Sequence, residues 1–344
     1  MESLIIRPDD IKRILEICGR DEVMRLMIQK LRECLASLGK GRIENSPARS
    51  GFTKYGDSPG VVEFMPHYSP GSGITMKSVA YSPRNSELSG LPTVLGYVCR
   101  IDEDTGVPLV IADGVVLTAM RTGAASAIAT GLLSPSEAHV VGIVGAGAQS
   151  VVQLHALSMV REIHKVLVLD IDPARAASLS KRASFLDVEF EEVVPERMLT
   201  ESDVICTTTS VGLGNGPVLP DAAHKPHLHI NSVGADEVGK TELPVSLLKR
   251  AAICVDHVEQ ALREGECQQI EPDEIWTSLG YLCAHPEEAE SRRFELTVFD
   301  STGFALEDHA ALDVFLELSR SIGLGEKIPI IHHPSDPFDP YSMD

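Results

Sequence analysis

The sequence predicts an α/β protein in which a doubly wound parallel sheet lies beside a mixed α+β region. Short strand-like runs follow one another before residue 113, whereas strand-like and helix-like segments alternate after it. Within the alternating half, the glycine-rich stretch "GIVGAGAQS" joins an apolar run to a segment with helical periodicity. The chain has 344 residues, 43% of them hydrophobic, which is enough to build two substantial cores.

Composition limits the class of protein. The net charge of −20, from 30 basic and 50 acidic residues, argues against nucleic acid and against anionic membranes, and is compatible with a cationic substrate. We find no uninterrupted run of about 18 apolar residues, and the start "MESLIIRPDDIKR" lacks the features of a secretory signal. Seven cysteines without a Cys-x-x-Cys pair suggest neither a disulfide framework nor a zinc site. We therefore expect a cytoplasmic protein without bound metal.

The first part of the chain combines helices and an antiparallel sheet. Asp9 or Asp10 can cap a first helix, and the helix-period segment 21–39 ends at Gly39. Strand-like runs follow at 61–65, 73–81, 91–101 and 107–112.

In the second part of the chain, strand-like and helix-like segments alternate. A helix of small residues, 117–133, leads into strand-like runs at 138–144, 165–172, 203–209, 228–234, 251–256 and 296–302, with helix-like or loop segments between them. A last helix, 307–325, lies beyond the final strand and is expected to return to the first domain, since a doubly wound domain does not need it. Four histidines occur in alternating or tandem positions, without a motif that would supply a third metal ligand. We therefore expect them to be structural or to lie on the surface: His227, His229, His332 and His333.

The glycine-rich turn predicts a Rossmann-type dinucleotide site. Gly145, Gly147 and Ser150 form G-x-G-x-x-S between a strand and a helix, where glycine allows a pyrophosphate to approach the backbone. Ser150 departs mildly from the usual Gly or Ala. Asp170 lies 25 residues after Gly145 at the end of the next strand, where a carboxylate can bind an adenosine ribose, although a solvated acid at a strand end is the alternative. Because Asp170 and Asp172 would repel a 2′-phosphate, we expect NAD rather than NADP.

Several further segments carry a family resemblance: "VVEFMPH", "GITMKSV", "AMRTGAAS", "INSVGADEVGKTELP" and "FDSTGFALED". In this order, over nearly the whole chain, the sequence resembles the ornithine cyclodeaminase and mu-crystallin family, which includes amino-acid cyclodeaminases, ketimine reductases and alanine dehydrogenases. The likeness is greatest to the branch that cyclises L-lysine, and it extends to "EQALREGECQQ" and the tail "HHPSDPFDPY". The resemblance implies a homodimer, with a substrate and dimerisation domain at 1–120 completed by 306–344, and an NAD-binding domain at 121–305.

The resemblance also implies substrate contacts. Lys77 and Arg121 match positions that hold an α-carboxylate, which an ammonium binds as a point charge and a guanidinium binds with two parallel hydrogen bonds. The alternative for Lys77 is a residue on the polar face of a strand, and for Arg121 a cation on the surface of a helix. Glu63 matches an acid facing the amino end of the substrate. Met65 in the same segment is assigned to the substrate site, and a role in packing alone is an equal alternative. Glu264 is assigned to chain-length preference, and the alternative is a solvated helix face.

Asp236 matches the catalytic aspartate of the family, and its presence favours a cyclodeaminase over a ketimine reductase. The alternative is that Asp236 caps the following turn. Asp300 and Thr302 are expected to shape the cofactor side of the cleft. The cofactor contacts implied by the motif and the resemblance together are Thr122, Gly145, Gly147, Ala148, Gln149, Asp170, Ser232, Lys240 and Ser301.

The reaction that the resemblance implies is the conversion of L-lysine to L-pipecolate and ammonia. NAD+ takes a hydride from Cα and returns it to the cyclic imine, so the nicotinamide is regenerated within each cycle. Three alternatives remain open: an ornithine cyclodeaminase that forms L-proline, an NAD(P)H-dependent ketimine reductase or amino acid dehydrogenase, and a crystallin-like binding protein without catalysis.

Overall fold

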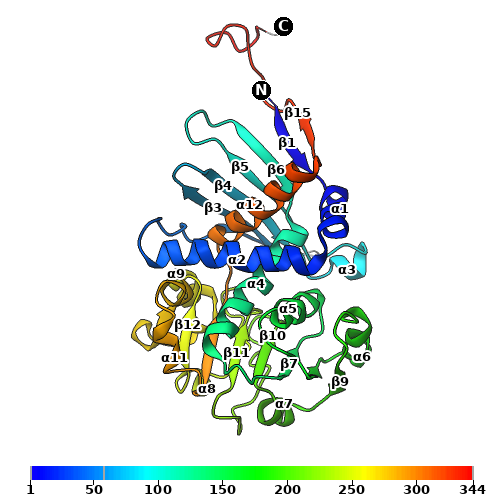
Figure 1. Cartoon of the computed structure of the whole chain (residues 1–344), viewed down its shortest axis with the longest axis vertical. Coiled ribbons are helices and arrows are strands. Elements are labelled where there is room, and N and C mark those ends of the chain that lie inside the picture. Colours follow the sequence, from blue (N-terminus) through cyan, green and yellow to red (C-terminus); the bar gives the residue numbers. More distant parts are fainter. Residues whose placement is uncertain (1, 57–58, 343–344) are drawn as a thin grey trace.

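The computed structural model describes residues 2–56 and 59–342, and two sheets dominate it (Figure 1). The first sheet has seven strands in the order β15-β1-β6-β5-β4-β3-β2, and all neighbours are antiparallel except β1 and β6. Its strands are β1 (Ser3–Ile6), β2 (Ser50–Lys54), β3 (Gly60–Ser69), β4 (Gly73–Tyr81), β5 (Val94–Ile101), β6 (Pro108–Asp113) and β15 (Glu326–Ile328). The four strands expected from the sequence are present, and β1, β2 and β15 are additional.

The start of the first helix differs from the expectation. Helix α1 (Pro8–Cys18) begins after Arg7, and the Asp10 carboxylate accepts a hydrogen bond from the Arg7 backbone N–H at 2.9 Å. Asp9 and Asp10 therefore lie in the first turn and neither is the N-cap, because Pro8 supplies the preset φ of the first helical position. Gly19, with φ +83°, separates α1 from α2 (Arg20–Gly39).

The second sheet is parallel throughout, in the order β13-β12-β14-β11-β10-β7-β8-β9. Its strands are β7 (Val140–Val144), β8 (Lys165–Leu169), β9 (Glu189–Glu192), β10 (Val204–Thr207), β11 (His229–Ser232), β12 (Ala252–Val255), β13 (Thr277–Ser278) and β14 (Thr297–Asp300). The chain reverses direction across the sheet between β7 and β10, which is where a doubly wound sheet forms its ligand crevice. The predicted fold class is confirmed, with β9 and β13 as additional edge strands.

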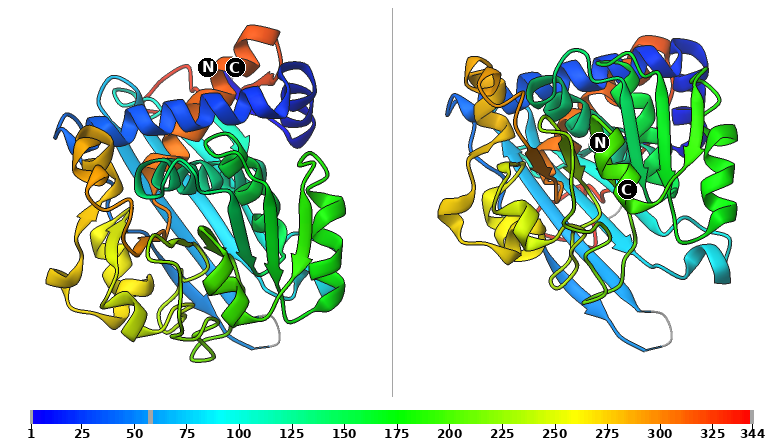
Figure 2. Two further views of the ribbon diagram at one scale, coloured as in Figure 1. Left: turned by 60° about the horizontal axis from the view of Figure 1, so that its bottom comes forward. Right: turned by 90° about the horizontal axis from the view of Figure 1, so that it is seen from below.

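Helices cover the parallel sheet, which comes forward in Figure 2 while the strands of the first sheet pass behind it. They are α5 (Ala148–Ser158), α6 (Pro173–Arg182), α7 (Pro195–Glu201), α8 (Val245–Leu248), α9 (Val258–Glu264), α10 (Leu279–Ala284) and α11 (Glu287–Glu290), with 3-10 turns at Glu266–Gln269 and Pro272–Glu274. The remaining short helix, α3 (Asn85–Leu88), lies between β4 and β5.

Two long helices connect the sheets. Helix α4 (Val115–Leu133) contacts α2 and α12 on one side and α5, β11 and β14 on the other. By length and composition α4 could cross a membrane, although Arg121 interrupts its apolar residues. Of its apolar window, 67% is buried inside the protein, as in a core helix. Helix α12 (Ala305–Ile322) lies against α1, α2, β3 and β4, so the chain returns to the first sheet after β14. The division at residues 120/121 and 305/306 stays a proposal, and its first boundary falls within α4.

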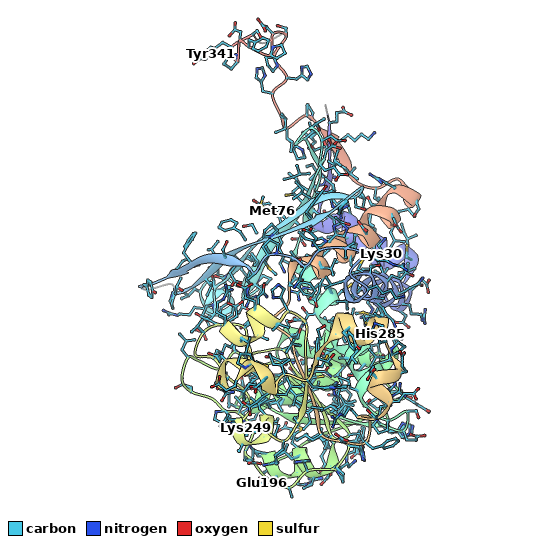
Figure 3. The ribbon with its side chains drawn as sticks, turned by 90° about the vertical axis from the view of Figure 1, so that its left-hand side faces the viewer. Lys30, Met76, Glu196, Lys249, His285 and Tyr341 are labelled. Atoms are coloured by element: carbon cyan, nitrogen blue, oxygen red, sulfur yellow. The ribbon has the colours of Figure 1, made fainter. Side chains whose placement is uncertain are left out.

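Side chains of the first sheet alternate between its two faces. Glu63 and Lys77 lie on the face toward α12 and the second sheet. The opposite face, which we call the open face, exposes between 38% and 59% of Phe52, Phe64, Tyr68, Tyr97 and Leu109. In Figure 3, Met76 marks the open face of β4 and Lys30 marks α2 in the helix layer on the other side.

Candidate active site

A cationic cluster forms where β4, α4 and α12 meet. Lys77 Nζ lies 3.0 Å from Asp308 Oδ1, and Arg121 Nη1 donates to Glu307 Oε2 at 2.6 Å. Arg121 Nε lies 3.3 Å from the same Asp308 oxygen. Only 1% of Lys77 and 6% of Arg121 are exposed, so the interpretations as a polar-face strand residue and a helix-surface cation are both wrong.

Burial shifts the pKa values of this cluster. It lowers the pKa of Lys77 to about 8, because the ammonium loses its hydration and Arg121 and Arg49 repel it, while Asp308 opposes the shift. Burial also raises the pKa of Glu307 to about 8 despite the nearby Arg121 guanidinium. The buried Nε of Arg121 has no hydrogen-bond partner among the described residues, so it is free to donate to an incoming anion.

A second cluster surrounds Arg49, which sequence reasoning missed. Arg49 Nε lies 2.7 Å from Glu264 Oε1 and 3.0 Å from Glu63 Oε1. Its Nη2 donates to the backbone carbonyl of Asp236 at 2.5 Å and its Nη1 to that of Thr302 at 3.1 Å. Arg49 thus connects the segment before β2 to the loops after β11 and β14. An isolated arginine in "SPARSGF" has no spacing that would have identified it.

Three carboxylates gather at this cluster: Glu63 on β3, Glu264 on α9 and Asp236 after β11. Only 5% of Glu264 is exposed, so its interpretation as a solvated helix residue is wrong. Burial raises the pKa of Glu63, with Asp236 and Glu264 adding to the shift and Arg49 opposing it. The clusters interact, since Lys77 is among the charges acting on Glu63. Met65 lies between them, buried and opposite Lys77 across β3 and β4, a position that favours packing.

Asp236 lies at the carboxyl edge of the parallel sheet. Its Oδ1 lies 2.9 Å from Lys240 Nζ, and 47% of its side chain is accessible. Loss of hydration next to the protein by itself raises the pKa of Asp236. The charges of Lys240 and Arg49, together with the hydrogen bond from Lys240, have a larger opposite effect, so the pKa is lowered. Among the described residues, the side chain of Lys240 rather than an amide of the following turn is its hydrogen-bond partner. The carboxylate is therefore ionised, accessible and held by a neighbouring cation.

The glycine-rich turn has the geometry that a dinucleotide requires. Gly145 has φ +91°, and a Cβ there would lie 3.0 Å from the backbone of Thr208 and Thr209. Gly147 is the N-cap of α5, and a Cβ on it would meet nothing within 4 Å, so the helix N-terminus is open to a phosphate. Ala148 and Gln149 form the first turn of α5.

Asp170 is held rather than freely solvated. Its Oδ2 accepts from the Ala146 N–H at 2.6 Å and its Oδ1 from the Asp172 N–H at 2.8 Å. Both oxygens keep a lone pair for a ribose. The residues present therefore fit the pyrophosphate and adenosine ribose of NAD.

The other predicted cofactor residues have their hydroxyls engaged by the protein. Ser232 Oγ donates to Glu266 Oε1 at 3.0 Å, and Ser301 Oγ donates to Asp256 Oδ2 at 3.2 Å. Thr122 Oγ1 donates to the carbonyl of Thr118 within α4 at 2.9 Å. Ser232 ends β11 and Ser301 follows β14, whereas Thr122 lies on α4. The cofactor contacts of all three stay predictions.

Asp300 and Thr302 lie at the carboxyl end of β14, at the same edge of the parallel sheet. Asp300 is fully buried, accepts the Cys267 N–H at 2.9 Å, and has its pKa raised to about 7 by burial. Thr302 Oγ1 donates to Asp256 Oδ1 at 3.2 Å. Of the four histidines expected to be structural or superficial, His229 is buried against Thr297 and the tandem pair at 332–333 is exposed. All seven cysteines are free, and the described residues contain no cluster suited to a metal ion.

Comparison with known proteins gives consistent results. The sequence model of the ornithine cyclodeaminase/mu-crystallin family matches residues 9–321. The L-lysine cyclodeaminase of Streptomyces rapamycinicus is 47% identical over 343 residues, covering all of both chains. A solved lysine cyclodeaminase, studied for recognition of L-lysine, L-ornithine and L-2,4-diaminobutyric acid, is 50% identical and superposes over 100% of both chains with a TM-score of 0.98. An archaeal alanine dehydrogenase dimer with bound NAD is 29% identical over 96% of this chain and 100% of its own, with a TM-score of 0.85.

Proposed function

The chain belongs to the ornithine cyclodeaminase/mu-crystallin family, and from this premise we propose that it is an L-lysine cyclodeaminase, converting L-lysine to L-pipecolate and ammonia. The observation that carries the proposal is the pair of adjacent clusters, one with buried cations and the other with an accessible carboxylate. One of them, around Lys77 and Arg121, suits a carboxylate, and the other, around Asp236, suits an ammonium.

The charged groups of the clusters support this orientation. Near neutral pH Glu307 is mostly protonated, because burial raises its pKa to about 8. In the first cluster the buried Nε of Arg121 has no hydrogen-bond partner among the described residues, so a carboxylate can accept from it. In the other cluster three carboxylates face the cations Arg49, Arg263 and Lys240, and Asp236 is the most accessible of the three carboxylates. A substrate with an α-carboxylate at one end and an ammonium at the other therefore meets a donor in one cluster and an accessible carboxylate in the other.

NAD is the cofactor, and the residues proposed to hold it are Gly145, Gly147 and the first turn of α5 at the pyrophosphate, with Asp170 at the ribose. When bound, NAD+ supplies a reversible hydride acceptor for the substrate Cα, so that the α-amine becomes an imine and the cyclised product regains the original oxidation level. Thr122, Ser232, Lys240 and Ser301 are proposed to contact it near the ends of β11 and β14.

The protein groups are proposed to bind, orient and move protons. Arg121 and Lys77 fix the α-carboxylate, so that the chain of the substrate extends toward Glu63 and Glu264. Asp236 takes a proton from the distal ammonium, because a protonated amine has no lone pair with which to close the ring. The same carboxyl group then returns a proton to departing ammonia. Holding both ends of one molecule converts ring closure into an oriented intramolecular step.

The test is incubation with L-lysine and a catalytic amount of NAD+. Ammonia and pipecolate should form in equal amounts, many times in excess of the NAD+ present, while total NADH stays constant. Net consumption of NAD(P)H in proportion to product would support a ketimine reductase or amino acid dehydrogenase instead. Absence of turnover with intact NAD binding would support a binding protein.

Chain length is part of the proposal. L-lysine and L-ornithine differ by one methylene, which a fitted pocket discriminates by about 1–3 kcal/mol, so both can react at different rates. We expect the higher kcat/KM for lysine. A higher value for ornithine, with proline as product, would correct the substrate and leave the mechanism in place.

A homodimer is the proposed assembly. The open face exposes the aromatic side chains of Phe52, Phe64, Tyr68 and Tyr97, a patch typical of a subunit interface, and the similar alanine dehydrogenase was solved as a dimer. The net charge of −20 and the seven free cysteines support a cytoplasmic enzyme that binds neither nucleic acid nor membranes.

A further inference from the structure

The last residues of the chain leave the body of the protein. After β15 the segment 329–342, which we call the tail, extends away from both sheets, and Tyr341 near its end lies far from the body (Figures 1 and 3). All but two residues of the tail are exposed. The described residues show no hydrogen bond between the tail and the rest of the chain.

The tail nevertheless has a defined conformation. Asp336 and Asp339 accept hydrogen bonds from the backbone N–H groups of Phe338 and Tyr341, at 2.9 Å and 3.0 Å. The Asp336 N–H donates to Ser342 Oγ at 3.0 Å, which closes the segment into a loop. Prolines at 329, 334, 337 and 340 restrict the backbone further. A segment that is ordered in advance loses little conformational entropy when it binds.

The tail carries apolar side chains that this fold leaves in water. Phe338 is 95% exposed and Tyr341 86%, while Ile330 and Ile331 are 40% and 48% exposed. Large aromatic side chains on a rigid segment are the residues that most often supply the binding energy of interfaces. A partner surface is therefore needed to bury them.

We propose that the tail of each subunit docks on the second copy of this chain in the homodimer, an inference that rests on the dimer proposed above. The tail starts at β15, the outermost strand of the sheet whose open face forms the proposed interface, and it leads away from its own subunit. In a homodimer with two-fold symmetry, a contact between one tail and the other subunit occurs twice, so that two identical contacts form.

The comparisons separate the tail from the general family fold. The family match ends at residue 321, before the tail begins, whereas the L-lysine cyclodeaminase relative is similar over the whole chain. The tail therefore lies, together with β15, outside the part of the chain that the family model matches.

A photo-cross-linking experiment tests where the tail docks. Tyr341 is replaced by p-benzoyl-phenylalanine in the full chain, and the irradiated protein is separated under denaturing conditions. We expect a cross-linked species with the mass of two chains. Phe294, which is 68% exposed and lies before β14, receives the same probe as a control and should give none. A cross-link confined to one chain, or none at position 341, would overturn the proposal.

Removal of the tail gives an independent measurement. A chain ending at Ile328, and the double variant Phe338→Ala with Tyr341→Ala, should dissociate into monomers at a concentration about 100-fold higher than the full chain, because two aromatic anchors are lost at each of two contacts. The exposed Leu88→Ala serves as a control. For very tight dimers the rate of subunit exchange is compared instead.

The outcomes distinguish the two proposals. A tail-less chain that dimerises within about threefold of the full chain would overturn the tail proposal and leave the dimer standing. A full chain that is monomeric at micromolar concentration would overturn the dimer and the tail contact together. NAD binding by the truncated chain, measured in parallel, shows that it has folded.

Discussion

Lys240 Nζ lies 2.9 Å from Asp236 Oδ1, so the carboxylate proposed to move protons is paired with a buried cation of the protein itself. Lys240 is only 4% exposed and also lies over the ring of Tyr81, 5.4 Å from its centroid. Asp236, by contrast, keeps 47% of its side chain accessible. The pair therefore holds Asp236 ionised from one side and leaves it open to a substrate ammonium on the other.

The first prediction concerns Asp236→Asn. The change keeps the size of the side chain and removes its capacity to take a proton, so kcat with L-lysine should fall by about 100-fold or more while folding and NAD affinity stay near normal. Steady-state kinetics and NAD titration measure both. Glu237→Gln, which removes the adjacent acid, is the control and should change kcat by less than about threefold. An Asn variant that cyclises lysine near the parental rate would exclude Asp236 from the mechanism.

The second prediction concerns Lys240→Met. Lys240 is the larger of the two charges that lower the pKa of Asp236, so its removal should raise that pKa. Catalysis needs the ionised carboxylate, and the acid limb of kcat/KM should therefore move to higher pH, so that activity is lost at a higher pH than in the parent enzyme. The pH profile is measured at saturating NAD. The control is Lys249→Met, which removes an exposed lysine at the C-terminus of α8 and should leave the acid limb of the pH profile unchanged. An acid limb that does not move in the Lys240 variant would contradict the pairing of Lys240 with Asp236.

The third prediction concerns Asp308→Asn and Lys77. The Lys77 ammonium exists below its pKa of about 8, so KM for lysine should rise as pH increases through that value. Asp308 opposes the lowering of this pKa through its charge and its hydrogen bond. Its neutralisation should move the rise in KM to lower pH. A pKa lower by about one unit would leave about fivefold less protonated Lys77 at pH 8 and increase KM there by about the same factor.

The control for this variant lies on the same helix. Asp313 pairs with Arg100 and Lys30, away from Lys77, so Asp313→Asn should leave the pH dependence of KM unchanged. If Asp308→Asn altered stability without moving the KM profile, its role would be structural only.

The fourth prediction compares two glycines of the same turn. Gly145→Ala forces a positive φ on alanine and places its Cβ against the Thr208 backbone, so the unfolding free energy should fall by about 2 kcal/mol or more and NAD affinity by at least about tenfold. Gly147 has φ −80° and open space around it, so Gly147→Ala should cost less than about 1 kcal/mol of stability. Denaturant unfolding of the NAD-free protein measures the difference, and equal losses would contradict the strain argument.

Much of the fold was predictable because its signals are local. The apolar runs that became β7, β8, β10, β11, β12 and β14 are short and bounded by turns, and their alternation with helical segments indicated a parallel sheet. The strands that the sequence did not reveal lie at sheet edges or are very short, such as β13 with two residues and β15 with three. β1 and β15 also pair across almost the whole chain, so no local pattern marks their partners.

The sequence by itself determined the dinucleotide turn at Gly145 and the placement of Asp170 and Asp236, because backbone strain and strand ends are properties of short segments. Only the tertiary structure decided which charges meet. Arg49 reaches Glu264 across 215 positions, and Lys77 reaches Asp308 across 231. A charge removed from water is stable only beside compensating partners. Those partners are brought into range by the packing of α12 against the first sheet and by the contacts of α9 with the segment before β2, rather than by any spacing along the chain.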